Sequence, residues 1–244
     1  AEDISESLKS LGFTVVLVKD ATLEEIDQAI SAFKDSLNSN EVGLFYFAGH
    51  GMQINGENYI IPIDNSFDDE ASIKHRSFPL SELIEKMSKC SNQTNIVVLD
   101  ACRDNPLSYK YRGGTGSTTL APMYAPKGTL ISFSTSPGEK ASDGRGRNGL
   151  FTESLLKHVS TPDLSIEEIL KRTRNTLYAL SNGKQTSWEH TSLTGNFYFK
   201  MNLTSTLTYS KFVIADKNFH LLTPNTASAL IKELRSYNWY KQND

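Results

Sequence analysis

The sequence predicts an α/β fold in which helices pack on a mostly parallel central sheet. Short apolar runs rich in β-branched residues alternate along the chain with longer stretches whose apolar residues recur every three or four positions. Strand–helix–strand units of this kind connect parallel strands through right-handed crossovers. The run Ile96–Leu99 has no polar face, as expected of a strand that is buried on both sides of such a sheet.

The first part of the chain predicts two helices, each placed beside a strand. Thr22, with Glu25 three residues later, forms a capping box, so a helix begins there. The expected elements in order are a helix from Ala1 to Gly12, a strand over Phe13–Val18, the helix after Thr22, and a buried strand over Val42–Ala48 that ends in a tight Gly49-His50-Gly51 turn.

The middle of the chain predicts a hairpin, further core strands and two long loops. Asn55-Gly56 is a strong hairpin turn. In order we expect paired strands Met52–Ile54 and Tyr59–Ile63, a polar loop Asp64–Arg76, a helix Pro79–Cys90, the strand ending near Cys102, a long loop Arg103–Lys127, a strand Gly128–Ser134, a Gly-rich loop Thr135–Asn148, helices Leu150–Val159 and Ser165–Leu180, and a last core strand Ser192–Phe199. The pattern changes after residue 200, so we expect one domain over 1–200. Residues 201–244 are then a C-terminal extension or the start of a regulatory segment.

Composition narrows the class of partner. The net charge of −3 offers no electrostatic basis for binding nucleic acid or an anionic membrane. No apolar run approaches the roughly 20 residues that span a bilayer, and no signal peptide is recognised. Two cysteines form no disulfide framework, and no paired Cys or His spacing predicts a zinc site. A cytoplasmic location fits a thiol that must stay reduced, and we expect no metal and no cofactor.

Two strand ends carry the residues that predict chemistry. Cys102 follows one buried strand and His50 follows another, 52 residues earlier (102 − 50). Open α/β sheets bind ligands at the carboxyl ends of their strands. If the two strands are neighbours, Cys102 can attack a carbonyl as a thiolate, and His50 can serve as its acid and base.

The residues around both positions resemble the caspase and metacaspase-like superfamily of cysteine peptidases, in particular its prokaryotic branch. Three ordered motifs carry the resemblance: F-Y-F-A-G-H-G at Phe45–Gly51, V-V-L-D-A-C-R-D at Val97–Asp104, and S-F-S-T-S-P-G at Ser132–Gly138. The resemblance implies a caspase-like three-layer αβα sandwich. It also implies that the first strand of that fold is absent from this chain, and that the Gly51 and Cys102 amides form an oxyanion hole. Prokaryotic relatives suggest a role in regulated cell death or antiviral defence.

Substrate preference is where the sequence departs from caspases, which cut after aspartate and hold it with arginines. Aligning the third motif places Asp143 where one of those arginines would lie. In metacaspase-like and paracaspase-like relatives, an acid at the position of Asp100 lies at the pocket floor, and Glu139 is a possible third acid. Such a pocket should prefer arginine or lysine, because it rejects like charge. Asp143 could instead serve only the Asp143-Gly144 turn.

The loops suggest processing and leave other possibilities open. Basic residues in or beside flexible stretches are candidate self-processing sites, with an activating ligand or regulatory domain as a further possibility: Lys110, Arg112, Lys127, and also Arg145 and Arg147. Calcium dependence has only the Asp68-Asp69-Glu70 cluster in its favour, and that cluster is typical of a solvated loop. An alternative to the peptidase is a catalytically silent domain that binds a partner or small signal. A flavodoxin-like nucleotide binder ranks last, because no phosphate-binding glycine loop follows the first predicted strand.

Overall fold

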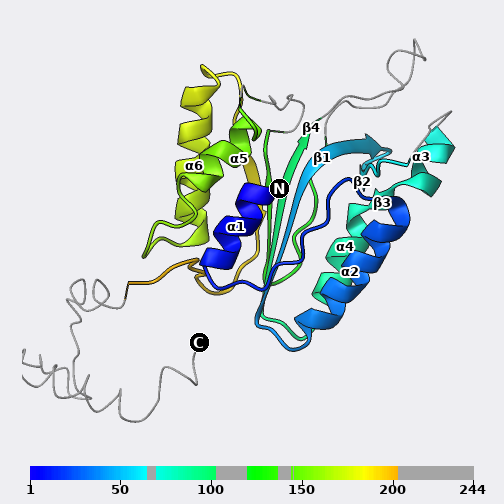
Figure 1. Cartoon of the computed structure of the whole chain (residues 1–244), viewed down its shortest axis with the longest axis horizontal. Helices are drawn as coiled ribbons and strands as arrows, with labels where there is room; N and C mark the ends of the chain where they lie inside the picture. The colour runs from blue at the N-terminus through cyan, green and yellow to red at the C-terminus, as the bar shows by residue number, and fades with distance from the viewer. Residues whose placement is uncertain (65–69, 103–119, 137–143, 145, 203–244) are drawn as a thin grey trace, which may run out of the picture. The chain divides into compact units, whose positions relative to one another are not determined.

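A six-stranded sheet forms the centre of the protein in the computed structural model, which describes residues 1–64, 70–102, 120–136, 144 and 146–202 (Figure 1). The sheet belongs to Ala1–Met201, which forms one compact unit of the chain. The strand order is β3-β2-β1-β4-β5-β6. The strands are β1 (Val42–Ile54), β2 (Glu57–Ile60), β3 (Phe78–Pro79), β4 (Thr94–Cys102), β5 (Thr129–Phe133) and β6 (Trp188–Thr191).

The middle of the sheet is parallel and its edges are antiparallel. β4 lies between β1 and β5 and runs parallel to both. β2, β3 and β6 join the sheet in antiparallel register. Of the described helices, two lie in the long crossover from β1 to β4, two precede β1, and two lie between β5 and β6.

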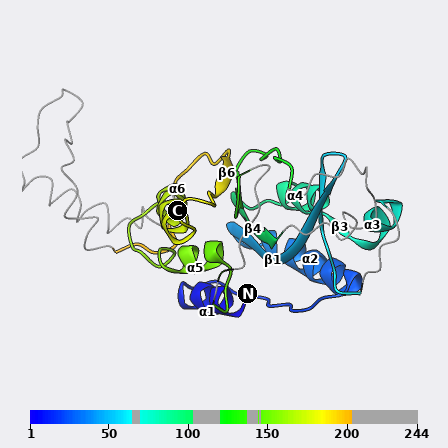
Figure 2. The same ribbon diagram turned by 90° about the horizontal axis from the view of Figure 1, so that it is seen from above.

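Helices cover both faces, which confirms the predicted three-layer αβα arrangement (Figure 2). Alternate residues of β4 enter two separate cores: Val97 and Leu99 pack toward α2 and α4, whereas Ile96 and Val98 pack toward α1, α5 and α6. Because side chains alternate between the faces of a strand, burial on both faces explains why β4 reads as an unbroken apolar run. The helices are α1 (Glu2–Ser10), α2 (Leu23–Leu37), α3 (Glu70–Arg76), α4 (Leu80–Ser88), α5 (Leu150–Leu156) and α6 (Ile166–Leu180).

Local signals in the sequence are confirmed where they involve only a few residues. Thr22 accepts a hydrogen bond from the Glu25 backbone N–H, and the Glu25 carboxylate accepts one from the Thr22 N–H, so the capping box is complete. Asn55 and Gly56 both have positive φ, at 52° and 84°, and they close the β1–β2 hairpin.

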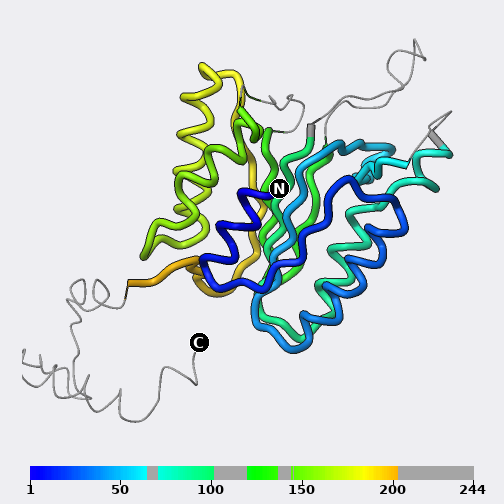
Figure 3. Tube along the Cα trace, viewed as in Figure 1, coloured from blue at the N-terminus to red at the C-terminus, as the bar shows by residue number. Residues whose placement is uncertain are grey.

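Three predicted elements are wrong. Phe13–Val18 is extended but belongs to no strand, and Figure 3 traces it between α1 and α2. Phe13 and Val15 pack against the α1 core, whereas Val16 is 73% exposed. β-branched residues alone therefore do not make this segment a strand, because it pairs with no neighbouring strand. The last core strand is Trp188–Thr191, not Ser192–Phe199, and the loop predicted over Asp64–Arg76 contains α3.

No helix in the described ranges has the length and apolarity needed to cross a bilayer.

Candidate active site

The β1–β4 ladder brings the two predicted catalytic positions together. Its register runs without a break from Val42↔Thr94 to His50↔Cys102. His50 is exposed, and Cys102 is the last residue of β4. The backbone thus places a histidine and a cysteine on adjacent strands at the carboxyl end of a parallel pair, where α/β sheets bind ligands. That they act as a catalytic dyad stays a prediction.

His50 lies inside a strand and not in the predicted turn. β1 continues through Gly49-His50-Gly51 to Ile54, because the hairpin partner β2 supplies a new ladder where the ladder with β4 ends. A Cβ at Gly49 would lie 2.8 Å from Cζ of the Phe47 ring, so this ring would have to shift to admit a side chain there. The predicted buried strand over Val42–Ala48 is also only half-buried along most of its length.

Gly51 is buried in a tight space between the two strands. A Cβ at this position would lie 3.1 Å from the Ala101 Cβ and 3.2 Å from the Leu120 Cδ2. The His50 carbonyl accepts a hydrogen bond from the Ile61 N–H, on the β2 side of the strand. Peptide groups of successive residues point to opposite edges of a strand, so the Gly51 amide points toward the β4 side. This orientation is compatible with the predicted oxyanion-hole role.

Asp100 lies two residues before Cys102, with 8% of its surface exposed. Its Oδ2 accepts a hydrogen bond from the Thr152 hydroxyl, and its carboxyl also bonds the Thr152 backbone and the Ser134 hydroxyl. Burial raises the pKa of Asp100, and these hydrogen bonds partly oppose that rise. No lysine or arginine among the described residues forms an ion pair with this carboxyl, so it is a buried acid that lacks a cationic partner there.

Tyr46 extends this contact to β1. Its hydroxyl lies 2.5 Å from the Thr152 Oγ1, and burial, followed by the nearby Asp100 charge, raises the pKa of the phenol. Sequence reasoning missed both Tyr46 and Thr152. A signal was available in each: Tyr46 is the only hydroxyl-bearing residue of its apolar strand, and Thr152 follows Phe151 and precedes Leu155 by three positions on a predicted helix. A polar group at a core position needs a partner.

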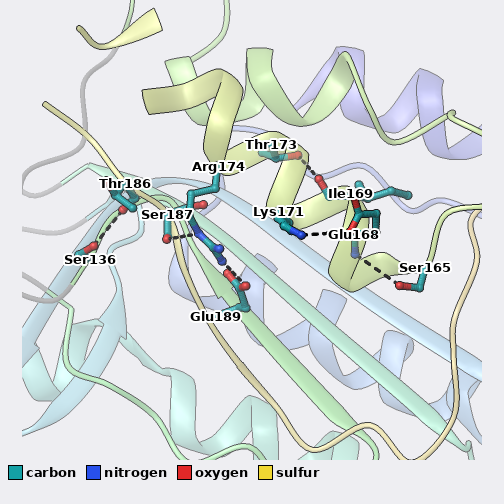
Figure 4. A network of polar contacts seen from close by, with 10 residues as sticks. All are labelled: Ser136, Ser165, Glu168, Ile169, Lys171, Thr173, Arg174, Thr186, Ser187 and Glu189. Carbon is teal, nitrogen blue, oxygen red and sulfur yellow. Dashed lines mark hydrogen bonds and ion pairs between the residues drawn. The ribbon is translucent and has the colours of Figure 1, made fainter. Parts of the chain in front are cut away.

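A second polar network holds the start of the predicted Gly-rich loop Thr135–Asn148, the loop that carries the predicted pocket acids (Figure 4). Arg174 of α6 forms an ion pair with Glu189 of β6. Ser136 donates its hydroxyl hydrogen to the Thr186 carbonyl at 3.2 Å. The end of β5 is therefore tied to the segment that leads into β6, directly before residues 137–143.

Of the candidate processing residues, the structure describes Lys127 and Arg147. Lys127, a candidate processing site, is exposed in the turn before β5, and Arg147 forms ion pairs with Glu2 and Asp3 of α1. Within the described ranges, no group of three His, Cys, Asp or Glu side chains is arranged to hold a metal ion. The predicted pocket acids Glu139 and Asp143, the candidate processing residues Lys110, Arg112 and Arg145, and the acids Asp68 and Asp69 lie outside the described residues.

Comparison with known proteins points to one family. A family model described as the caspase domain, Peptidase_C14, matches residues 1–198. The human protein named mucosa-associated lymphoid tissue lymphoma translocation protein 1 is 28% identical over 103 residues, which make up 41% of this chain and 12% of that protein. Its mouse homolog matches with the same identity and the same shares. The chain therefore aligns with only a small part of these two relatives.

Proposed function

The chain belongs to the Peptidase_C14 caspase-domain family, and from that premise we propose that it is a cysteine endopeptidase that cuts polypeptides after arginine or lysine. The observation that carries the preference is the Asp100 carboxyl. It is buried at the end of β4, two residues before Cys102, and none of the described lysines or arginines pairs with it. Burying a carboxylate without a cation costs free energy, and a cationic substrate side chain would offset that cost.

The proposed reaction uses the two strand ends. The Cys102 thiolate attacks the carbonyl carbon of the substrate residue that precedes the cut, and a tetrahedral oxyanion forms. The Gly51 and Cys102 amides stabilise this oxyanion, which is typically worth about 3 kcal/mol per donor. His50 then gives a proton to the leaving amine, and the C–N bond breaks to leave a thioester. Water, deprotonated by His50, hydrolyses the thioester and regenerates the thiol.

Substrate charge is recognised next to this chemistry. The register pairs Asp100 with Ala48 on β1, two positions before the His50–Cys102 pair. A cation bound at Asp100 would therefore lie close to the scissile bond, as expected for the residue that directly precedes the cut. Glu139 and Asp143 are proposed to add negative charge from the loop after β5.

Active-site labelling tests the proposal and separates it from a silent binding domain. The protein is treated with peptidyl electrophiles that differ only in ending with arginine, lysine or aspartate, and the adduct is located by mass spectrometry. We expect a single adduct on Cys102 with the arginine and lysine reagents, and none in Cys102→Ala. Cys90→Ala is the matched control, because the Cys90 thiol is half-buried and contacts the Lys86 carbonyl at 3.3 Å. Labelling by the aspartate reagent alone, or by none, would count against the proposal.

A further inference from the structure

Three elements meet around the Asp100 carboxyl through a directed chain of hydroxyl groups. A threonine hydroxyl carries one hydrogen, and that of Thr152 is donated to the Asp100 Oδ2. The Tyr46 hydroxyl, 2.5 Å from the Thr152 Oγ1, must then be the donor in its own contact. Hydrogen-bond donation therefore runs from β1 through α5 to the carboxyl at the end of β4, and each bond polarises the next.

The position of this carboxyl is fixed from several sides. Thr152 is 2% exposed and Ser134 is 3% exposed, and both bond to Asp100. Gly149, at the start of α5, leaves room for it: a Cβ at this position would lie 3.0 Å from the Asp100 Oδ2. A carboxyl bounded by backbone on one side and by two hydroxyls has little freedom to change rotamer.

We propose that Thr152 is a positioning residue for substrate recognition, holding the Asp100 carboxylate where it receives the cationic side chain of the residue before the cut, and that Tyr46 holds Thr152 in turn. The inference rests on the proposed function and deepens it. It assigns to α5 and β1 a part in selecting arginine and lysine.

The charge that Asp100 must carry to bind a cation supports the same role for Thr152. Binding a cation requires Asp100 to be ionised, whereas burial favours the protonated acid. The hydrogen bonds from Thr152, followed by the one from Ser134, lower the pKa of Asp100 and so act against burial. The titratable group that shares this chain of contacts is the Tyr46 phenol on β1, whose pKa the Asp100 charge helps to raise. Without the Thr152 hydroxyl, a smaller share of the protein would carry the charged carboxylate at a given pH.

A purely structural role for Thr152, as a contact that only joins α5 to β4, predicts a different result. Loss of such a contact would lower stability and leave the pH dependence of substrate binding unchanged. The test is therefore kcat and KM as a function of pH, with matched fluorogenic peptides ending in arginine or lysine.

Three variants share this test. Thr152→Val keeps the shape and removes the hydroxyl, Thr152→Ser keeps the hydroxyl, and Tyr46→Phe removes only the distant donor. For Thr152→Val we expect KM to rise about tenfold or more with little change in kcat, and the acid limb of kcat/KM to move to higher pH. Thr152→Ser should retain the wild-type profile. Tyr46→Phe should move the limb in the same direction by a smaller amount, and it serves as the test if Thr152→Val does not fold.

The outcomes separate this inference from the function on which it rests. If the wild type cleaves after arginine or lysine while Thr152→Val and Tyr46→Phe keep its KM and its acid limb, the positioning role is wrong and the proposed function stands. If the wild type cleaves neither peptide, both are wrong.

Discussion

His50 and Cys102 are Cα partners on adjacent parallel strands, although 52 residues separate them in the sequence. The register is fixed along nine consecutive pairs, beginning at Val42↔Thr94. A slip of one residue would exchange the β4 side chains that fill the two separate cores and would disturb the packing of both. The alignment of the two candidate catalytic residues is therefore a consequence of how the sheet buries its side chains.

This relationship predicts a specific loss of activity. His50→Ala should lower kcat for an arginine peptide by about 10²- to 10⁴-fold, the usual contribution of a general acid–base, with little effect on thermal stability because His50 is exposed. Activity is measured with a fluorogenic peptide and stability by thermal unfolding. His158→Gln is a suitable control, since His158 follows α5 and forms a hydrogen bond with Thr176 of α6. Equal activity of His50→Ala and wild type would contradict the assignment.

Gly51→Ala tests the narrow space between β1 and β4. The added methyl group would lie 3.1 Å from the Ala101 Cβ, so the packing between the two strands must shift slightly to admit it. We expect a loss of about 1–3 kcal/mol in the free energy of unfolding and a marked drop in kcat, since the Gly51 amide moves with its strand. Gly195→Ala is the matched control, because no atom lies within 4 Å of a Cβ at that exposed position. Urea unfolding of both variants checks this; a Gly51→Ala protein as stable and active as Gly195→Ala would refute it.

Asp100→Asn should change how stability depends on pH. Burial raises the pKa of Asp100 above its usual value of 3.8, so the folded state favours the protonated carboxyl. This stabilisation is complete below the usual pKa and is lost as pH rises through the raised pKa. Asparagine cannot ionise and escapes the loss. The free energy of unfolding of the variant minus that of the wild type should therefore increase as the pH rises above 3.8.

Urea denaturation at several pH values measures this difference. A difference that stays constant, or that falls as pH rises, would mean that Asp100 is not a destabilised buried acid.

Self-processing follows from a preference for basic residues, if the candidate sites are accessible. The intact mass of the wild type should show cleavage after Lys110, Arg112 or Lys127, whereas Cys102→Ala should keep its full mass because the nucleophile is missing. Mixing active protein with Cys102→Ala distinguishes cleavage within a molecule from cleavage between molecules. Full-length, uncleaved chains in both proteins, whose masses differ only by the substitution itself, would exclude processing at these residues.

The sequence predicted best the features that depend only on neighbouring residues. The Thr22 capping box and the Asn55-Gly56 hairpin need only neighbouring residues, and both are confirmed. The buried strand before Cys102 also followed from its own composition, because a strand covered on both faces has no polar side. The three-layer αβα arrangement was implied by the resemblance to the caspase and metacaspase-like superfamily, and it is confirmed.

The elements and contacts that the sequence did not predict depend on residues that are distant in sequence. Phe13–Val18 has the composition of a strand but pairs with no other strand. The end of β1 was predicted too early, because pairing with β2 extends this strand past His50. The Asp100–Thr152 bond joins residues 52 positions apart, on a strand and a helix. No local pattern shows which buried hydroxyl meets which carboxyl, so sequence reasoning found Asp100 but not the residues that hold it.

The most direct test of the central claim is to map every bond that the protein cuts in a complex peptide mixture. Wild type, Cys102→Ala and Cys90→Ala are incubated with the same mixture, and the new termini are identified by mass spectrometry. We predict that wild type and Cys90→Ala produce termini whose preceding residue is arginine or lysine, and that Cys102→Ala produces none. Cleavage after aspartate, cleavage that persists without Cys102, or no cleavage by any of the three would contradict the account.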